Sequence, residues 1–249
     1  MSIQFSDTTN YDGLIQFVER TLGFPRGYIS GNTDRLKEWT AELNLALDKV
    51  MSAIFSADGR YQFDDGNHTT YPILTGNLVD GQRDYSFTED ADANLVLKIL
   101  RVFVRTSTTT PYYEIFPVDV QSDREDIITN LADGMNTKGR PDRYDLTATG
   151  IFLDPIPSAN VTAGLKVYVS REGSYFTTAD TTKKPGYYGL YHEYLILDAC
   201  YRYARANRLE IKGDLSVDLL EMKKEVVEAY SKRNPHDTLI MQNEPIIYE

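Results

Sequence analysis

Cysteine, histidine and long apolar runs are scarce in this sequence of 249 residues. The single cysteine, Cys200, excludes an internal disulfide and any zinc site built on cysteines. No apolar run approaches the ~20 residues that a bilayer-spanning helix needs. The first residues, Met1 to Asp7, have neither the basic start nor the apolar stretch of a signal peptide. We therefore expect a globular chain that is made in the cytoplasm and contacts no membrane.

Positive charge is also in deficit, because 26 Lys and Arg face 37 Asp and Glu and the net charge is −11. The acidic excess falls mainly in the first hundred positions. Such a surface repels a polyanion, which argues against a general nucleic-acid binder. Tyrosine is abundant instead, with 18 Tyr against 10 Phe and 1 Trp. This bias fits either a Tyr-rich β-sheet or a surface that binds a partner, and both interpretations stay open.

The residues that enzymes use for catalysis stand in no recognisable context. None of the three histidines, His68, His192 and His236, lies beside a nucleophile motif such as Gly-x-Ser-x-Gly. Cys200 has apolar neighbours such as Leu197, so we expect a small core residue rather than a nucleophile. His192 begins an expected helix, where a structural role is the simpler interpretation. The sequence therefore predicts no catalytic residues and no enzyme.

The acidic clusters of the sequence do not match known metal-binding loops. Residues 90–94 begin like an EF-hand loop, but Leu95 and Arg101 stand where that loop needs Gly and Glu. Residues 64–67 are typical of an ordinary turn. A Gly-rich phosphate loop and a dinucleotide-binding fingerprint are missing as well. We expect no metal site and no cofactor.

Apolar residues at three- and four-residue steps predict two amphipathic helices near the N-terminus. The first covers residues 11–23 and ends at Gly23, and the second covers residues 34–57. Asn32 or Thr33 can cap the second helix.

The same periodicity predicts two further helices near the C-terminus, over residues 190–208 and 215–233. Residues 212–214, Lys-Gly-Asp, are expected to form the break and the next N-cap between them. Each of the four helices has one apolar face to bury, so we expect the two helix pairs to pack together as a bundle.

Between the helix pairs, short β-type runs alternate with turn residues. These runs are Tyr61–Phe63, Thr70–Thr75, Asp84–Thr88, Leu95–Arg105, Tyr112–Val118, Tyr144–Leu153 and Leu165–Ser170. The last run is expected to return as the hairpin partner of the run before it. A capping-box pattern predicts one short helix from Ser122 to Gly134. Seven short strands favour an antiparallel β-sandwich or a barrel-like domain.

Together these patterns predict an α+β fold, in which a four-helix bundle formed by the N- and C-terminal helix pairs carries an inserted β-domain. The expected division is residues 1–59 and 190–233 for the helical bundle, 60–176 for the β-domain with its short helix, 177–189 for a connector, and 234–249 for an extended C-terminal arm.

The C-terminal arm is too short and too broken by proline to form a helix, yet it holds two apolar clusters. Chain ends with so much apolar surface usually dock on something. One alternative is that the arm lies along its own domain, and the other is that it reaches a neighbouring subunit. Our candidates for partner contact are Leu239, Ile240 and Met241 in the first cluster and Ile246, Ile247 and Tyr248 in the second.

Several stretches of the sequence, taken in order, carry a resemblance to a known family. They are residues 71–87 (YPILTGNLVDGQRDYSF), 97–104 (LKILRVFV), 139–157, 165–169 and 191–195 (YHEYL). In this order the chain resembles the head-to-tail adaptor (connector ring) proteins of tailed bacteriophages, close to the podovirus-type tail accessory factors and ring proteins. That family pairs a helical bundle with a β-insertion.

The resemblance implies a structural virion protein at the head–tail junction. Copies would form a closed, homo-oligomeric ring, dodecameric in the family, between the portal protein and downstream tail or nozzle proteins. The C-terminal arm would brace an adjacent subunit or the portal. DNA would pass through the ring without specific binding, and an acidic bore would repel the DNA and let it slide.

Three other functions fit parts of the pattern. Another tail component, such as a nozzle, tube or baseplate ring, would share the ring but contact different partners. A carbohydrate-binding β-sandwich would use the abundant Tyr residues as a sugar platform. A glycosidase would need two carboxylates in one cleft. We place the adaptor ring first, another virion ring second, and the last two behind them.

Overall fold

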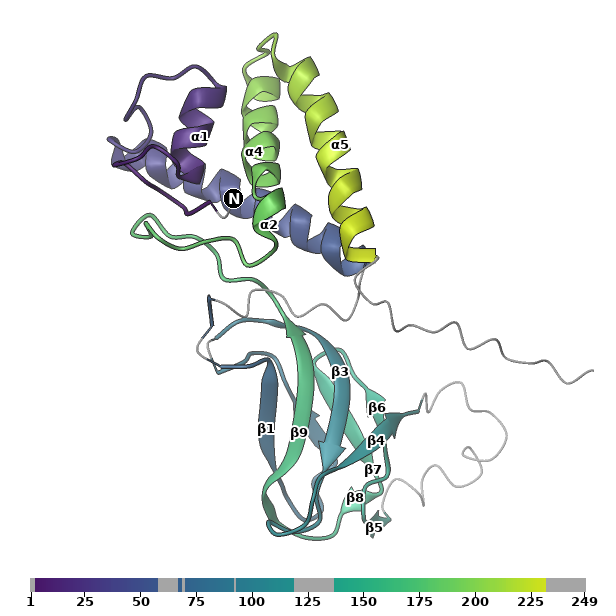
Figure 1. Ribbon diagram of the computed structural model, residues 1–249. Coiled ribbons are helices and arrows are strands. Elements are labelled where there is room, and N and C mark those ends of the chain that lie inside the picture. The colour runs from purple at the N-terminus through teal and green to yellow at the C-terminus, as the bar shows by residue number, and fades with distance from the viewer. Residues whose placement is uncertain (1–2, 58–66, 69, 92, 119–136, 232–249) are drawn as a thin grey trace, which may run out of the picture.

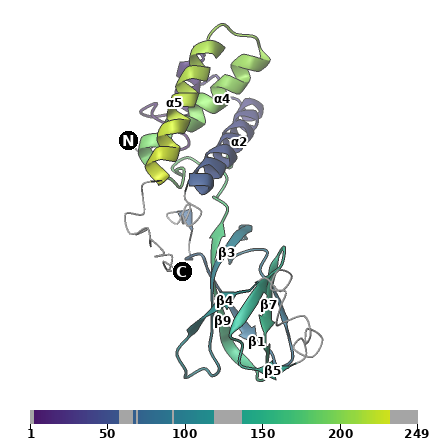
Figure 2. The same ribbon diagram turned by 90° about the vertical axis from the view of Figure 1, so that its right-hand side faces the viewer.

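Helices gather at one end of the molecule and strands at the other, as Figures 1 and 2 show from two sides. The computed structural model describes residues 3–57, 67–68, 70–91, 93–118 and 137–231. We call the helices with the segments packed on them the helical body, and the strands with their turns the β-body. Among the described helices, none is long and apolar enough to cross a membrane.

The helical body holds four α-helices and one short 3-10 helix within the described residues. They are α1 (Leu14–Thr21), α2 (Thr33–Ala57), η3 (Gly189–Tyr191), α4 (Glu193–Ala206) and α5 (Lys212–Ser231). Helix α4 packs against α1, α2 and α5, and α2 also contacts α5. The core holds most of the apolar positions predicted from periodicity, among them Leu14, Ile15, Val18, Trp39, Leu43, Leu47, Val50, Ile54, Tyr194, Leu197, Leu215, Val226 and Tyr230.

Helix α2 begins where the sequence predicts. The side-chain oxygen of Asn32 accepts hydrogen bonds from the backbone N–H groups of Asp34 and Arg35, both at 3.1 Å, so Asn32 is the cap. Asp34 lies in the first turn, where the helix dipole favours a negative charge. Within α2, Lys49 joins the helix to α4, because it donates hydrogen bonds of 2.8 and 3.0 Å to the buried carboxylate of Asp198.

Two predicted helix boundaries near the C-terminus are wrong. Helix α5 begins at Lys212, so residues 212–214 belong to its first turn and do not form the break. The break comes earlier, where Arg208 adopts a left-handed backbone conformation with φ of 56°. The helix predicted from residue 190 begins at Glu193 instead, and Leu190 lies in η3 and is 75% exposed.

The β-body holds nine described strands. They are β1 (Ile73–Leu78), β2 (Asp84–Ser86), β3 (Val96–Val104), β4 (Tyr113–Pro117), β5 (Lys138–Gly139), β6 (Arg143–Leu146), β7 (Gly150–Asp154), β8 (Ile156–Pro157) and β9 (Val161–Arg171). Seven of them form one sheet in the order β1-β9-β3-β4-β6-β7-β2, and β5 pairs with β8. The large sheet curls into a half-barrel (Figure 1). The predicted α+β fold with a barrel-like β-part is confirmed.

Strand β9 is an interior strand of the sheet, next to the edge strand β1, and it pairs antiparallel with β1 on one side and β3 on the other. Its residues Leu165, Val167 and Val169 are fully buried and point into the half-barrel. The alternate residues, such as Lys166 and Tyr168, therefore lie on the outer face of the sheet.

The strand pairing differs from the prediction in two respects. The run Tyr144–Leu153 is not one strand but the hairpin β6–β7, in which Tyr144 pairs with Leu153. The turn between the two strands, Thr147 to Thr149, contains none of the residues that usually mark turns. Its predicted partner, Leu165–Ser170, instead belongs to β9, which pairs with β1 and β3.

The sheet is mixed rather than purely antiparallel, because β4 and β6 run parallel, as do β5 and β8. Parallel neighbours need a crossover of a dozen or more residues, and the chain between Pro117 and Arg143 is long enough to supply one. The predicted short helix from Ser122 to Gly134 and the predicted strand Tyr61–Phe63 lie outside the described residues.

Gly150 lies where β2 approaches β7 too closely for any side chain. A Cβ atom on Gly150 would lie 2.1 Å from the carbonyl oxygen of Tyr85. We expect Gly150→Ala to lower the free energy of unfolding by about 1–3 kcal/mol, because the strands must separate. Gly213→Ala is the matched control, since nothing lies within 4 Å of that site and alanine favours the helix by about 0.5–1 kcal/mol. Urea unfolding measures both, and equal effects of the two substitutions would contradict the prediction.

Candidate functional site

The six residues predicted to contact a partner lie outside the part of the chain that the structure describes. They are Leu239, Ile240, Met241, Ile246, Ile247 and Tyr248. Their role in binding stays a prediction. Within the described residues, the candidate functional features are a buried ion pair and a groove at the junction of the two bodies, and exposed apolar and charged side chains on the surface.

Cys200 and His192 are both buried and both serve the helical core. Burial raises the pKa of the Cys200 thiol to about 12, so the thiolate that a nucleophile requires does not form near neutral pH. His192 is 1% exposed. Its Nδ1 accepts a hydrogen bond from the backbone N–H of Ile3 at 3.0 Å, and its Nε2 donates to the carbonyl of Tyr187 at 3.0 Å. The imidazole therefore joins the N-terminal segment to the connector before α4.

A buried ion pair marks the end of β9 at the junction. Arg171 Nη1 lies 3.0 Å from Asp90 Oδ2, and both side chains are 1% exposed. The other oxygen of Asp90 accepts hydrogen bonds from the backbone N–H and the side chain of Asn94. Asp90 opens the segment that begins like an EF-hand loop, and its carboxylate is directed to Arg171 and Asn94. In the described ranges, no group of three or more His, Cys, Asp or Glu side chains could hold a metal ion.

Beyond Arg171 the chain runs along α2 and forms several hydrogen bonds with it. The Gly173 N–H points at the sulfur of Met51 at 3.1 Å. Asn44 forms two hydrogen bonds of 2.9 Å with the backbone of Phe176, one as donor and one as acceptor. These contacts fix the segment after β9 against one side of α2.

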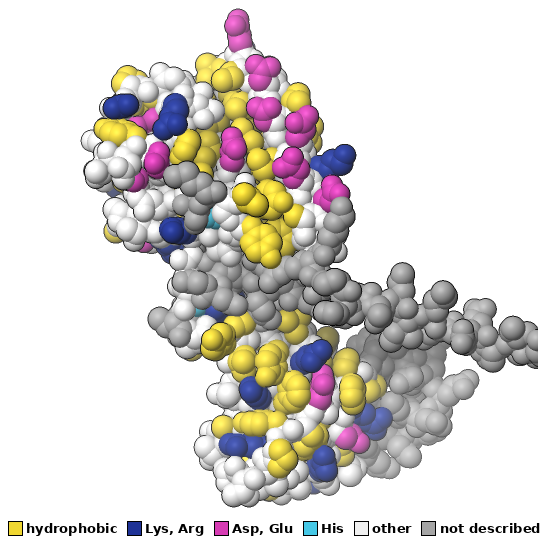
Figure 3. All heavy atoms as spheres, in the orientation of Figure 1, with side chains coloured by type: hydrophobic (Ala, Val, Ile, Leu, Met, Phe, Trp, Pro, Cys, Tyr) yellow, Lys and Arg dark blue, Asp and Glu magenta, His cyan; other side chains and the backbone are white. Residues whose placement is uncertain are grey.

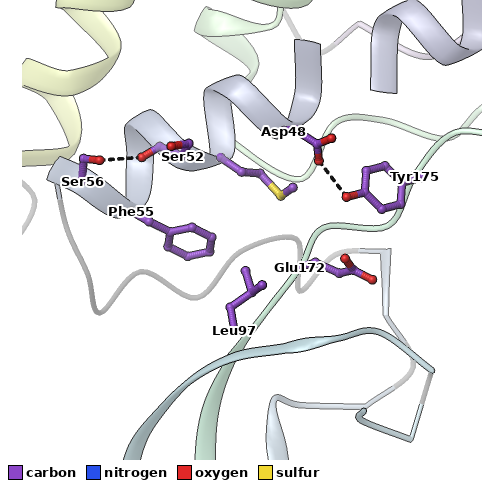
Figure 4. A pocket seen from close by; sticks show the side chains of 8 residues that line it. Asp48, Ser52, Phe55, Ser56, Leu97, Glu172 and Tyr175 are labelled. Atoms are coloured by element: carbon purple, nitrogen blue, oxygen red, sulfur yellow. Dashed lines mark hydrogen bonds between the residues drawn. The ribbon is translucent and has the colours of Figure 1, made fainter. Parts of the chain in front are cut away.

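An open groove of about 430 Å³ lies beside this segment, between α2 and β3 (Figure 4). Its lining residues are Asp48, Met51, Ser52, Phe55 and Ser56 of α2, Leu97 of β3, and Glu172 and Tyr175 of the segment after β9. The Tyr175 hydroxyl donates a hydrogen bond of 2.7 Å to Asp48. Burial and this carboxylate raise the pKa of Tyr175, so the phenol stays protonated. Met51, Phe55 and Leu97 make the groove suited to an apolar side chain.

The surface has exposed apolar residues on both bodies. The most exposed are Tyr71, Phe116, Leu190 and Leu220. Figure 3 shows mostly acidic side chains on the right of the helical body and mostly Lys and Arg side chains on the β-body, with apolar side chains on both. This distribution is typical of a protein that buries surface against other chains.

One comparison with known families decides the identity. The family model of the SU10 adaptor proteins matches residues 9–222, which is most of the chain. The chain belongs to the SU10 adaptor protein family. A search of curated proteins found no match.

Membership makes the chain a bacteriophage adaptor, a structural component of the virion, and it implies contacts with portal and tail proteins. The predicted family resemblance is thereby confirmed. The match begins at residue 9, so it includes α1 and α2, on which the resemblance found in the sequence had no motif. The adaptor family is a structural family.

The junction of the adaptor contains residues that sequence reasoning missed. Arg171 and Asp90 lie 81 positions apart, and no local pattern connects two such residues. The pairing of Asn44 with Phe176 spans 132 positions and is equally invisible in a single sequence. The one available signal was that the charged residue Arg171 comes directly after the predicted strand Leu165–Ser170 and so indicates where that strand ends.

The two hydrogen bonds of His192 predict a pH-dependent stability. Burial lowers the pKa of His192 below its usual value, so the unfolded chain binds a proton at a pH where the folded chain does not. The neutral His192 side chain therefore makes its full contribution to the free energy of unfolding above about pH 6.5. This contribution is lost as the pH falls toward the lowered pKa of the folded state. We expect His192→Gln to flatten the fall in the free energy of unfolding between pH 7.5 and 5.5. Urea titrations at both pH values measure this change, and a His192→Gln variant whose free energy of unfolding falls in parallel with that of the wild type would contradict the prediction.

The junction ion pair predicts a large effect from a single substitution. Asp90→Ala leaves the guanidinium of Arg171 buried without its carboxylate, which costs about 3–5 kcal/mol of unfolding free energy. Asp84→Ala removes an exposed carboxylate of the same body and should change the unfolding free energy by no more than about 0.5 kcal/mol. Chemical denaturation compares the two variants. A loss for Asp90→Ala as small as that of the control would contradict a structural role for the ion pair.

Proposed function

We propose that this adaptor forms a cyclic ring, of twelve copies as the family resemblance implies, that joins the phage portal to the tail and continues the DNA channel. The observation that carries the proposal is the match of the SU10 adaptor family over residues 9–222. The ring would lie at the head–tail junction of the virion, with the portal protein on one side and tail or nozzle proteins on the other.

The two-body arrangement supports a ring subunit. The helical body and the β-body are stacked along one direction (Figures 1 and 2), so each can contact a different layer of a virion. A protein that repeats one contact from copy to copy closes into a ring when the rotation between copies allows it. The exposed apolar residues on both bodies supply surface for such contacts.

The C-terminal arm is the part that we propose to extend the ring contacts beyond the two bodies. Helix α5, which precedes the arm in the sequence, ends at Ser231 on the side of the helical body that faces the β-body (Figure 1). The apolar clusters of the arm, which contain Ile240 and Tyr248, would bind the adjacent subunit or the portal.

The charge of the chain supports passage of DNA without binding. A net charge of −11 per copy, repeated around a ring, would produce a negative potential that repels the phosphate backbone. DNA would then slide through the channel rather than adhere to its wall. Another tail ring, such as a nozzle, remains the second candidate, and the partner that the protein binds separates it from an adaptor.

The mass of the purified protein, measured across concentration with and without the portal of the same phage, tests the proposal. We expect a closed ring, formed either by the protein alone or on the portal. Deletion of residues 234–249 should keep the helical content and weaken portal binding at least about tenfold, because that segment holds two apolar clusters. A chain that stays monomeric with the portal and with every tail component would overturn the adaptor ring.

A further inference from the structure

Helix α5 carries a stripe of acidic residues on its exposed side. Asp214, Asp218, Glu221, Glu225 and Glu228 follow one another at steps of four and three residues, so they lie on one side of the helix over about 21 Å. All five are exposed. The first four form no ion pair with a described residue, and Figure 3 shows acidic side chains following this helix. The exposed Lys224 borders the stripe on one side, but like charges at such spacing still destabilise an isolated helix, so a partner of opposite charge would complement the stripe.

Large apolar side chains lie beside the acidic stripe. Val217 is 55% exposed and Leu220 is 65% exposed, and both follow the same helix. Exposed apolar side chains next to aligned charges are typical of a protein–protein contact, in which the apolar part is buried and the charges set the register. We call the stripe together with Val217 and Leu220 the acidic patch.

The outer face of the β-sheet has the opposite charge. Arg101 of β3 and Lys166 of β9 point outward, because they precede the inward-facing, buried residues Val102 and Val167. Lys166 lies over the rings of Tyr112 and Tyr168, at 5.7 and 5.3 Å, and Arg105 lies 5.0 Å from the centre of Tyr112. These cation–π contacts hold the positive groups on the surface of the sheet.

Apolar side chains accompany these cations as well. Phe103 packs edge-on against Tyr168, with ring centres 5.4 Å apart, and Phe116 of β4 is 65% exposed. The neighbouring carboxylate on this face is Glu114, 3.7 Å from Arg101. We call this face, with Arg101, Arg105, Lys166, Phe103, Phe116 and Tyr168, the basic patch.

We propose that the acidic patch of one copy docks on the basic patch of a second copy of this chain. The two patches belong to different bodies and lie well apart within one molecule (Figure 3), so one chain does not satisfy both by itself. Their charges are opposite, and each holds an exposed apolar side chain, Leu220 on one and Phe116 on the other. A nucleic acid is the less suitable occupant of the basic patch, because nucleic-acid interfaces carry far more positive charge than three cations beside one carboxylate.

The inference rests on the proposed function in one respect, which is that copies of the adaptor assemble with one another. A contact between two different patches either repeats around a ring or is made twice about a two-fold axis, as when two copies pack face to face. The mass of the assembly distinguishes the two symmetries, and the contact itself is the same in both.

Charge exchange between the patches is the test. One variant carries Glu221→Lys and Glu225→Lys, which lie away from the start of α5, where acidic residues favour the helix. The other carries Arg101→Glu and Lys166→Glu, and it keeps Arg105, whose guanidinium donates hydrogen bonds to the carbonyls of Thr108 and Thr162. Each variant alone places like charges opposite one another at the substituted positions of the contact, and we expect its Kd for self-association to rise at least about tenfold. An equimolar mixture brings opposite charges together again and should restore association.

The control variant carries Glu38→Lys and Asp84→Lys, an equal change of charge at exposed sites outside both patches. It should associate like the wild type in mass measurements across concentration. Leu220→Cys and Phe116→Cys on separate chains give a second readout, because oxidation should link them in the wild-type charge background and not when one patch is reversed.

The outcomes separate the inference from the proposed function. Rings that form equally well with the wild type and with both single-patch variants would overturn the inference and leave the adaptor ring intact. A wild type that remains monomeric alone and on the portal, and that traps no disulfide, would overturn both. Binding of a single-stranded DNA probe that is lost with Arg101→Glu and Lys166→Glu, without any effect on association, would assign the basic patch to nucleic acid instead and overturn the inference.

Discussion

The ion pair between Arg171 and Asp90 fixes the point at which the sheet passes the chain to the helices. Both side chains are buried, so their charges are compensated by each other rather than by water. Arg171 ends β9, the strand that pairs with both β1 and β3, and Asp90 begins the turn between Glu89 and Leu95, which form an isolated β-bridge. The pair therefore holds this turn of the β-body on an interior strand of the sheet. The Glu172 N–H then bonds to the carbonyl of Leu95 at 3.0 Å, which continues the same attachment.

The contacts along α2 depend on this attachment, because they begin one residue later. Asn44 and Met51 bond to the segment after β9, and Tyr175 bonds to Asp48. These polar contacts are directional, whereas apolar packing alone tolerates sliding. The orientation of the β-body relative to α2 is thus specified by a short run of hydrogen bonds. In this adaptor the junction therefore gives the helical body and the β-body a defined relation.

Local patterns predicted what depends on neighbours in sequence. Periodicity placed the four helices, and the Asn32 cap placed the start of α2, since both follow from contacts within a few residues. The predicted start of α5 was wrong because Gly213 resembles a helix break, whereas the chain turns between α4 and α5 at Arg208. The β6–β7 hairpin was missed because its turn lacks Gly, Asn and Pro, and the parallel pairing of β4 with β6 depends on a crossover that no local pattern specifies. The candidate arm lies outside the described residues, and the buried ion pair joins positions too far apart for a single sequence to connect.

Strand β9 has a mechanical consequence. It runs unbroken through the β-body for 11 residues, shares ladders with two neighbours, and continues into the segment bonded to α2. A load applied across the sheet is therefore shared by two rows of hydrogen bonds before it reaches the buried ion pair. From there it passes to a helix of 25 residues without crossing a loose linker. The β9–α2 connection thus acts as a stiff strut, through which pressure on one end of the subunit displaces the other.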